Sequence, residues 1–139
     1  MPNFNRLAFG AATLSLMVLT LPALAQESCA ELDTALTVVR AQEFAPLVAQ
    51  AAEGTKPEQV EFMDFATSGD WSFVHAATPV ADPGFFFFQK VGGKHQFKDV
   101  WGGIALASER PEVVSWADAL GAPANLTACF ADSAVGDEE

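Results

Sequence analysis

The chain has 139 residues, 7 of them basic and 18 acidic, and half of its residues are apolar. The apolar fraction excludes an acidic disordered chain, and the net charge of −11 argues against nucleic acid or an anionic membrane surface as the partner. Two cysteines are too few for a four-cysteine zinc site or an iron–sulfur cluster.

Residues 1–25 predict a cleaved signal peptide. Arg6 is their only charged residue, an uncharged apolar stretch covers residues 7–24, and an A-L-A cleavage motif ends at Ala25. A retained transmembrane anchor is the alternative, since about 20 apolar residues can span a bilayer, but glycine, serine and threonine dilute this stretch. Cleavage would leave a secreted or periplasmic chain without a membrane anchor, with six basic and 18 acidic residues and a charge of −12.

An exported chain also changes the meaning of its two cysteines. In an oxidising compartment Cys29 and Cys129 are predicted to form one disulfide. Redox-active pairs are usually close in sequence, as in C-x-x-C, so we interpret this distant pair as structural. Closing a loop of about 100 residues stabilises a fold by roughly 4–5 kcal/mol in chain-entropy models.

The first predicted element of the mature chain is an amphipathic helix. Ser28 and Glu31 have the spacing of a capping box, and an apolar stripe follows at Leu32, Leu36 and Val39. Pro46 predicts a kink or break, followed by a shorter helix that ends near residue 52.

The hydrophobic period then changes to two, which predicts strands. We expect four of them, connected by a turn at residues 67–70, a loop at residues 78–84 and a Gly92-Gly93 hairpin turn, at residues 60–66, 71–76, 85–91 and 95–101. The four consecutive phenylalanines at residues 85–88 fit a strand covered on both faces.

A second helix is predicted to start at residues 108–111 and to stop at Gly121. Residues 122–131 carry Cys129 back to the body, and residues 132–139 read as a disordered acidic tail. The predicted fold is therefore one α+β domain over residues 26–131. It has an N-terminal helix, a four-stranded antiparallel sheet of two hairpins and a C-terminal helix, with the helices on one sheet face.

The turn of the first hairpin sets which side chains are neighbours. A two-residue turn at residues 68–69 would pair Ala66 with Trp71. Asp64 and His75 then become diagonal neighbours on an aromatic face, within reach of each other.

The second hairpin repeats this arrangement. A Gly92-Gly93 turn would pair Phe88 with Phe97. The same register pairs Phe86 with Asp99, on a face that also carries His95.

One hypothesis groups these residues into a metal-binding or acid/base site: Asp64, His75, His95 and Asp99. Imidazole and carboxylate ligands suit zinc, copper or nickel, and an Asp–His pair can act as an oriented base. The alternative is that His75 is a partly buried strand residue and His95 a solvated turn residue. The chain has no H-E-x-x-H spacing, no nucleophile motif and no phosphate-binding loop. We therefore expect no cofactor and favour a protein that is not an enzyme.

A second hypothesis concerns Phe85, Phe87 and Val100, which share the other predicted face. They form either a second layer of core or an exposed patch that binds an envelope protein or a small apolar ligand.

Several short motifs resemble a group of small secreted bacterial proteins of uncharacterised function. In that group a GDWxFV strand precedes a GG hairpin and a C-terminal WAxxLGAP helix. The matching segments here are GDWSFV, VGG, VW, SWA and LGAP, at residues 69–74, 91–93, 100–101, 115–117 and 120–123. Phe97 stands where the group often has tryptophan. The resemblance covers residues 69–123 and implies a bacterial exported domain, with no activity or site residues.

These features together predict a small exported binding domain, most simply periplasmic, that binds a protein or an apolar ligand. Its acidic surface fits basic partners. The alternatives are a metal-binding or acid/base enzyme that uses the His/Asp cluster, and a structural envelope protein without a ligand.

Overall fold

The computed structural model describes residues 27–136, so the predicted signal peptide lies outside the described residues. The elements in chain order are α1 (Glu27–Ala30), α2 (Val38–Ala51), η1 (Pro57–Gln59), β1 (Glu61–Ser68), β2 (Trp71–Thr78), β3 (Ala81–Val91), β4 (Lys94–Gly102), η2 (Ala107–Glu109), α3 (Arg110–Leu120) and α4 (Ala124–Ala134). The strands form one antiparallel sheet in the order β1-β2-β3-β4, which confirms the predicted α+β fold.

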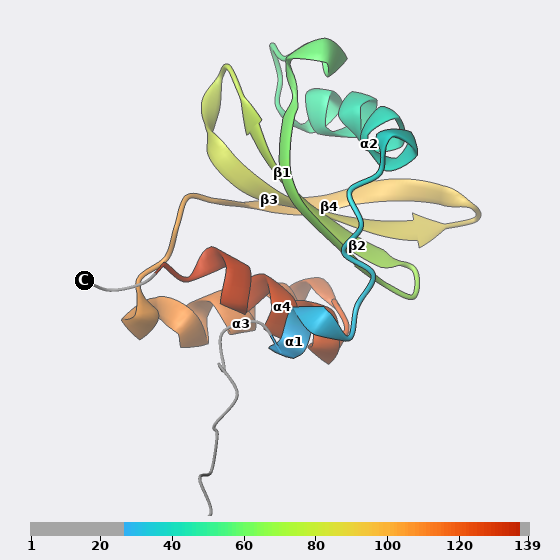
Figure 1. Cartoon of the computed structure of the whole chain (residues 1–139). Coiled ribbons are helices and arrows are strands. Elements are labelled where there is room, and N and C mark those ends of the chain that lie inside the picture. The colour runs from blue at the N-terminus through green and yellow to red at the C-terminus, as the bar shows by residue number, and fades with distance from the viewer. Residues whose placement is uncertain (1–26, 137–139) are drawn as a thin grey trace, which may run out of the picture.

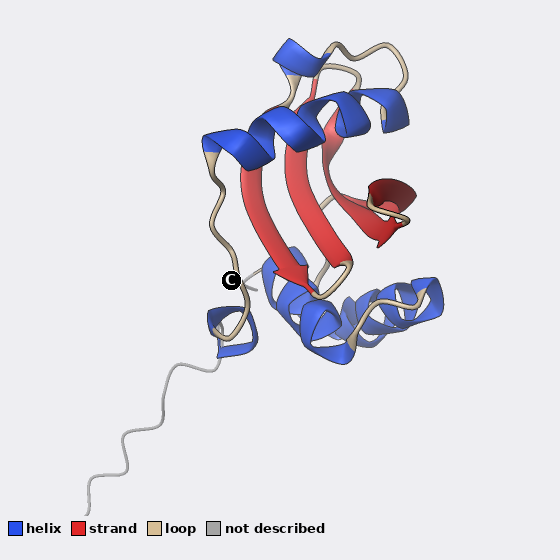
Figure 2. Ribbon diagram, turned by 90° about the vertical axis from the view of Figure 1, so that its right-hand side faces the viewer, coloured by secondary structure: helices blue, strands red, loops and turns tan. Residues whose placement is uncertain are grey.

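Helices cover both faces of this sheet. Helix α2 lies across one face, while α1, α3 and α4 lie against the other (Figures 1 and 2). The expectation of helices on one face is therefore wrong. The phenylalanine run explains why: Phe85 and Phe87 point to the three-helix side, Phe86 and Phe88 point to α2, and none of them is more than 5% exposed. Two separate cores result from the two-residue alternation of β3.

The predicted helix starting at Ser28 is interrupted after one turn. Helix α1 ends at Ala30, residues 34–37 are extended, and α2 begins after Thr37, whose side chain accepts a hydrogen bond from the Arg40 amide at 3.1 Å. The expected apolar stripe does not form, since Val39 is 71% exposed. Threonine is a favoured N-cap, so it sets a new helix start at that point.

Pro46 lies inside α2 and does not end it. A proline in a helix interior removes one hydrogen bond and costs about 3 kcal/mol. Phe44 and Val48, on either side, are almost completely buried against the sheet. The burial of these side chains offsets the cost, so the predicted break does not occur.

The first hairpin turns at Gly69-Asp70, one residue later than predicted, because Ser68 pairs with Trp71. Gly69 has a φ of +59°, a conformation that glycine adopts readily. The shifted turn places Asp64 directly opposite His75, and the register shift between Phe62 and Asp64 leaves Met63 without a partner on β2. The predicted diagonal arrangement is therefore replaced by a direct pair.

The β3–β4 hairpin turns at Gly92-Gly93 and pairs Phe88 with Phe97, as predicted. The predicted pairing of Phe86 with Asp99 is wrong. A bulge at Lys98 adds one residue to β4, so Asp99 lies opposite Phe87 instead. The expected loop at residues 78–84 is a tight turn, since β3 already begins at Ala81.

Helix α3 ends as predicted at Gly121, which has a φ of +95°. The following segment, expected only to return to the body, forms α4. The predicted tail boundary at Asp132 is also wrong, because this residue lies in α4 and its carboxylate pairs with Arg110. Only residues 137–139 of the expected tail lie outside the described residues. The Cys29–Cys129 disulfide is present and ties α1 to α4.

Candidate functional site

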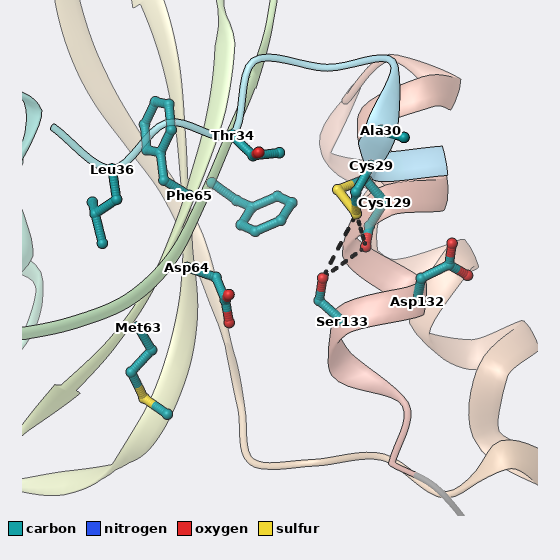
Figure 3. A pocket seen from close by; sticks show the side chains of 11 residues that line it. Cys29, Ala30, Thr34, Leu36, Met63, Asp64, Phe65, Cys129, Asp132 and Ser133 are labelled. Carbon is teal, nitrogen blue, oxygen red and sulfur yellow. Dashed lines mark hydrogen bonds between the residues drawn. A yellow bond between two sulfur atoms is a disulfide. The ribbon is translucent and has the colours of Figure 1, made fainter. Parts of the chain in front are cut away.

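A pocket of about 390 Å³ opens between the outer strand β1 and the helices α1 and α4 (Figure 3). Its lining comes from segments distant in the sequence: α1, the connecting segment (residues 31–37), β1, β2 and α4. The residues are Cys29, Ala30, Thr34, Leu36, Met63, Asp64, Phe65, Phe73, Cys129, Asp132 and Ser133. The disulfide between α1 and α4 forms part of the wall.

Asp64 supplies the free carboxylate of this pocket. Its side chain leaves β1 and points into the space between β1 and α4 (Figure 3), and it is 58% exposed. One oxygen, Oδ2, accepts a hydrogen bond from Nδ1 of His75 at 3.0 Å. The other oxygen has no hydrogen-bond partner among residues 27–136. It can accept a hydrogen bond from a ligand.

His75 is the hydrogen-bond partner of the Asp64 carboxylate. The imidazole is 5% exposed and stacks on the Phe85 ring, with 4.0 Å between ring centroids and 6° between planes. Packing and the bond to Asp64 therefore fix its orientation. The direct β1–β2 pairing produces this contact, because paired residues on adjacent strands have neighbouring side chains.

The two polar side chains that α4 contributes to the pocket, Ser133 and Asp132, both bond within the protein, although Oδ2 of Asp132 is buried without a hydrogen-bond partner among the described residues. Ser133 Oγ donates to the carbonyl of Cys129 at 3.0 Å, and it lies 3.9 Å from the Cys29 sulfur. The Asp132 side chain, 8% exposed, turns away from Asp64 (Figure 3) and accepts from Arg110. Asp64 is therefore the more accessible of the two carboxylates in the pocket lining.

The connecting segment is fastened to the sheet at Asp33. Its carbonyl accepts from the Thr67 amide at 3.0 Å, and its carboxylate pairs with both terminal nitrogens of Arg40. The hydrogen bonds from Arg40, followed by the one from the Ala35 amide, lower the pKa of Asp33 to about 2. Leu36, at the rim of the pocket, is held in place by this anchor and by the disulfide.

The four-residue His/Asp site predicted from the sequence does not form. His75 and Asp64 meet, but His95 lies on the opposite face of the sheet, packed on Phe44. Asp99 is separated from β2 by β3 and accepts a hydrogen bond from the Val100 amide.

His95 has a different acidic partner. Its Nε2 lies 2.8 Å from a carboxylate oxygen of Glu43 on α2. Among residues 27–136, no three His, Cys, Asp or Glu side chains are grouped so that they could hold a metal ion.

The predicted binding patch is not a surface. Phe85 and Phe87 are completely buried, with their rings 5.1 and 4.9 Å from that of Phe130 on α4. Val100 is 36% exposed but belongs to the other face, where it pairs with Phe86. Phe85 and Phe87 therefore belong to the core on the three-helix side of the sheet, and Val100 lies at the edge of the α2 side. The bulge in β4 is what moves Val100 to that side.

Sequence reasoning missed most of the pocket, including Thr34, Leu36, Met63 and Ser133. The sequence pattern predicts a continuous helix through Thr34 and Leu36 and a tail that includes Ser133, whereas the structure has a connecting segment and α4 there. No local pattern marks these residues as neighbours. The one available signal was the predicted disulfide, which brings the start of the domain next to its end.

Comparison of the chain with protein-family models, curated proteins and solved structures found no match. None of the helices formed by residues 27–136 is long and apolar enough to cross a membrane.

Proposed function

We propose that this protein is an exported binding domain whose pocket takes a positively charged, partly apolar segment of an envelope protein. The observation that carries the proposal is the Asp64 carboxylate, fixed by His75 at the mouth of a 390 Å³ pocket with one oxygen free.

Export is supported by the sequence of residues 1–25 and by the cysteine pairing. A signal-like segment precedes the domain, and the two cysteines of the chain form a disulfide. Disulfides persist in secreted and periplasmic proteins and are rare in the reducing cytosol.

The walls of the pocket favour a ligand that is apolar as well as cationic. Leu36 and Met63 are 38% and 50% exposed at its rim, and Phe73 lines the interior. A lysine or arginine side chain has this composition, because an apolar stem carries a charged end. The charge of −12 predicted for the mature chain would also attract a basic partner.

The test uses two peptides that differ in one charge: N-acetyl-Leu-Lys-Leu-amide and N-acetyl-Leu-Gln-Leu-amide. Each is titrated into the ¹⁵N-labelled, disulfide-bonded protein. We expect the lysine peptide to shift the amide resonances of Leu36, Met63 and Asp64 at lower concentration than the glutamine peptide.

The variant Asp64→Asn keeps the size of the side chain and removes its charge. It is expected to weaken binding of the lysine peptide by ~2- to 5-fold, the size of an exposed ion pair. Asp82→Asn makes the same charge change at an exposed residue on β3, away from the pocket, and should leave binding unchanged. Equal shifts with both peptides, or shifts outside the pocket, would overturn the proposal.

A further inference from the structure

The tip of the β3–β4 hairpin projects beyond the rest of the sheet. The last pair between β2 and β3 is Trp71 with Gln89, and the Lys90 amide still donates to the carbonyl of Asp70 in the β1–β2 turn at 2.7 Å, so the free part of the hairpin begins at Val91. Every residue from Lys90 to Lys94 is exposed. The Gly92-Gly93 turn makes this tip narrow.

The chemistry of the tip differs from that of the rest of the molecule. Val91 is 46% exposed, and Lys90 and Lys94 flank it. Three of the four lysines of the chain lie within residues 90–98, although acidic residues outnumber basic ones 18 to 7 overall. The tip therefore presents an apolar side chain between two cations. This is the combination of charge and apolar surface proposed above for the ligand of the Asp64 pocket.

The tip does not reach the pocket of its own copy by a small movement. The pocket lies at β1 and the tip extends from β4, and these are opposite edges of the sheet. Three strand spacings, on the order of 14 Å, separate the two edges.

We propose, on the basis of the function proposed above, that the occupant of the pocket is the hairpin tip of a second copy of this chain. Lys94 or Lys90 pairs with Asp64, and Val91 packs against Leu36 and Met63. This contact joins two different surfaces, so it is heterologous: one copy of a bound pair still has a free pocket and the other still has a free tip.

Charge has opposing effects on this association. Two acidic copies repel each other, but at 0.15 M salt the repulsion between exposed charges is screened beyond about 8 Å. A lysine in contact with Asp64 lies well inside that distance. The local pair therefore acts against a weakened long-range repulsion, and we expect weak, concentration-dependent association.

The experiment is sedimentation equilibrium of the exported, disulfide-bonded protein over a range of concentrations at 0.15 M salt. The weight-average mass is expected to rise with concentration. Lys94→Glu and Asp64→Lys should each weaken association at least ~5-fold, because each replaces an attraction by a repulsion. Lys56→Glu, with the same charge change at an exposed lysine outside the tip, is the matched control.

Mixing the two variants gives the decisive observation. The normal tip of Asp64→Lys fits the normal pocket of Lys94→Glu, and the two altered surfaces attract each other, so the mixture should associate again. If Asp64→Lys does not form its disulfide, the loss of association is measured with Asp64→Asn instead.

A constant monomer mass with intact binding of the lysine peptide would overturn self-association and leave the pocket function standing. A constant mass with no peptide binding would overturn both proposals. Equal effects of Lys94→Glu and Lys56→Glu would show a general charge effect, which also overturns the proposed contact.

Discussion

Asp33 shows how one side chain fastens a segment that has no regular structure. Two nitrogens of Arg40 bond to its carboxylate, and Arg40 also donates to the carbonyl of Ala35 at 2.7 Å. The carboxylate is therefore ionised over a wider pH range than an ordinary aspartate. Because its pKa is lowered in the folded state, the contribution of the pair to stability is complete above the unfolded pKa, near 3.8. It is lost as the pH falls through about 2.

Removing Arg40 should therefore raise the pKa of Asp33. In Arg40→Met we expect it to rise from about 2 towards 3.8, held slightly below that value by the hydrogen bond from Ala35. Arg40→Lys keeps the charge but not the two-point bond, so it should raise the pKa by a smaller amount. Titration of the carboxyl ¹³C resonance measures both values, and an unchanged pKa in Arg40→Met would contradict the assignment.

Among the elements, the β1–β2 hairpin turn depends on a single glycine. Gly69 has a φ of +59°, and a Cβ added there would meet no atom within 4 Å. Gly69→Ala should cost about 1 kcal/mol from backbone strain alone. Gly102→Ala is the matched control, because its site is equally open and its φ lies outside the left-handed region. It should be neutral or slightly stabilising, and urea unfolding of both variants would show the difference or its absence.

The elements also show what a sequence can reveal. The strands were predictable because alternating apolar residues and glycine turns are local signals, and both recur along residues 60–101. The register was only partly predictable. A bulge at Met63 and another at Lys98 each shift by one residue the pairs that lie farther from the hairpin turn, and no sequence pattern indicates either bulge. The direct Asp64–His75 contact depends on the position of the turn at Gly69-Asp70, one residue later than the sequence predicts, so only the structure places the two side chains together.

The prediction of the N-terminal helix was wrong for a related reason. The residues around Ser28 fit a capping box, but the cap that starts α2 is Thr37. Local patterns compete, and tertiary contacts decide between them. Here the disulfide at Cys29 and the pairing of Asp33 with Thr67 hold the intervening chain in an extended path. The pocket exists because of that path, and so it was not predictable from the sequence.

At the scale of the whole molecule, the disulfide should make a large contribution to stability. In the double variant Cys29→Ser, Cys129→Ser, the closed loop is lost, and we expect the free energy of unfolding to fall by roughly 4–5 kcal/mol. Urea unfolding of the oxidised protein and of this variant measures the change. The oxidised protein treated with reductant is the control and should match the variant. A difference below ~1 kcal/mol would mean that the two helices hold together without the bond.

The same bond has a topological consequence. It closes residues 29–129 into a covalent ring that contains the entire sheet. A protease that cuts the exposed stretch after α2, around Glu53 and Gly54, would therefore open the ring without releasing a fragment. The nicked molecule would remain one covalent particle, heavier only by the water added, and both halves would stay beside each other to re-form the same pairs of strands. In a compartment rich in proteases, a domain built this way tolerates a single cut.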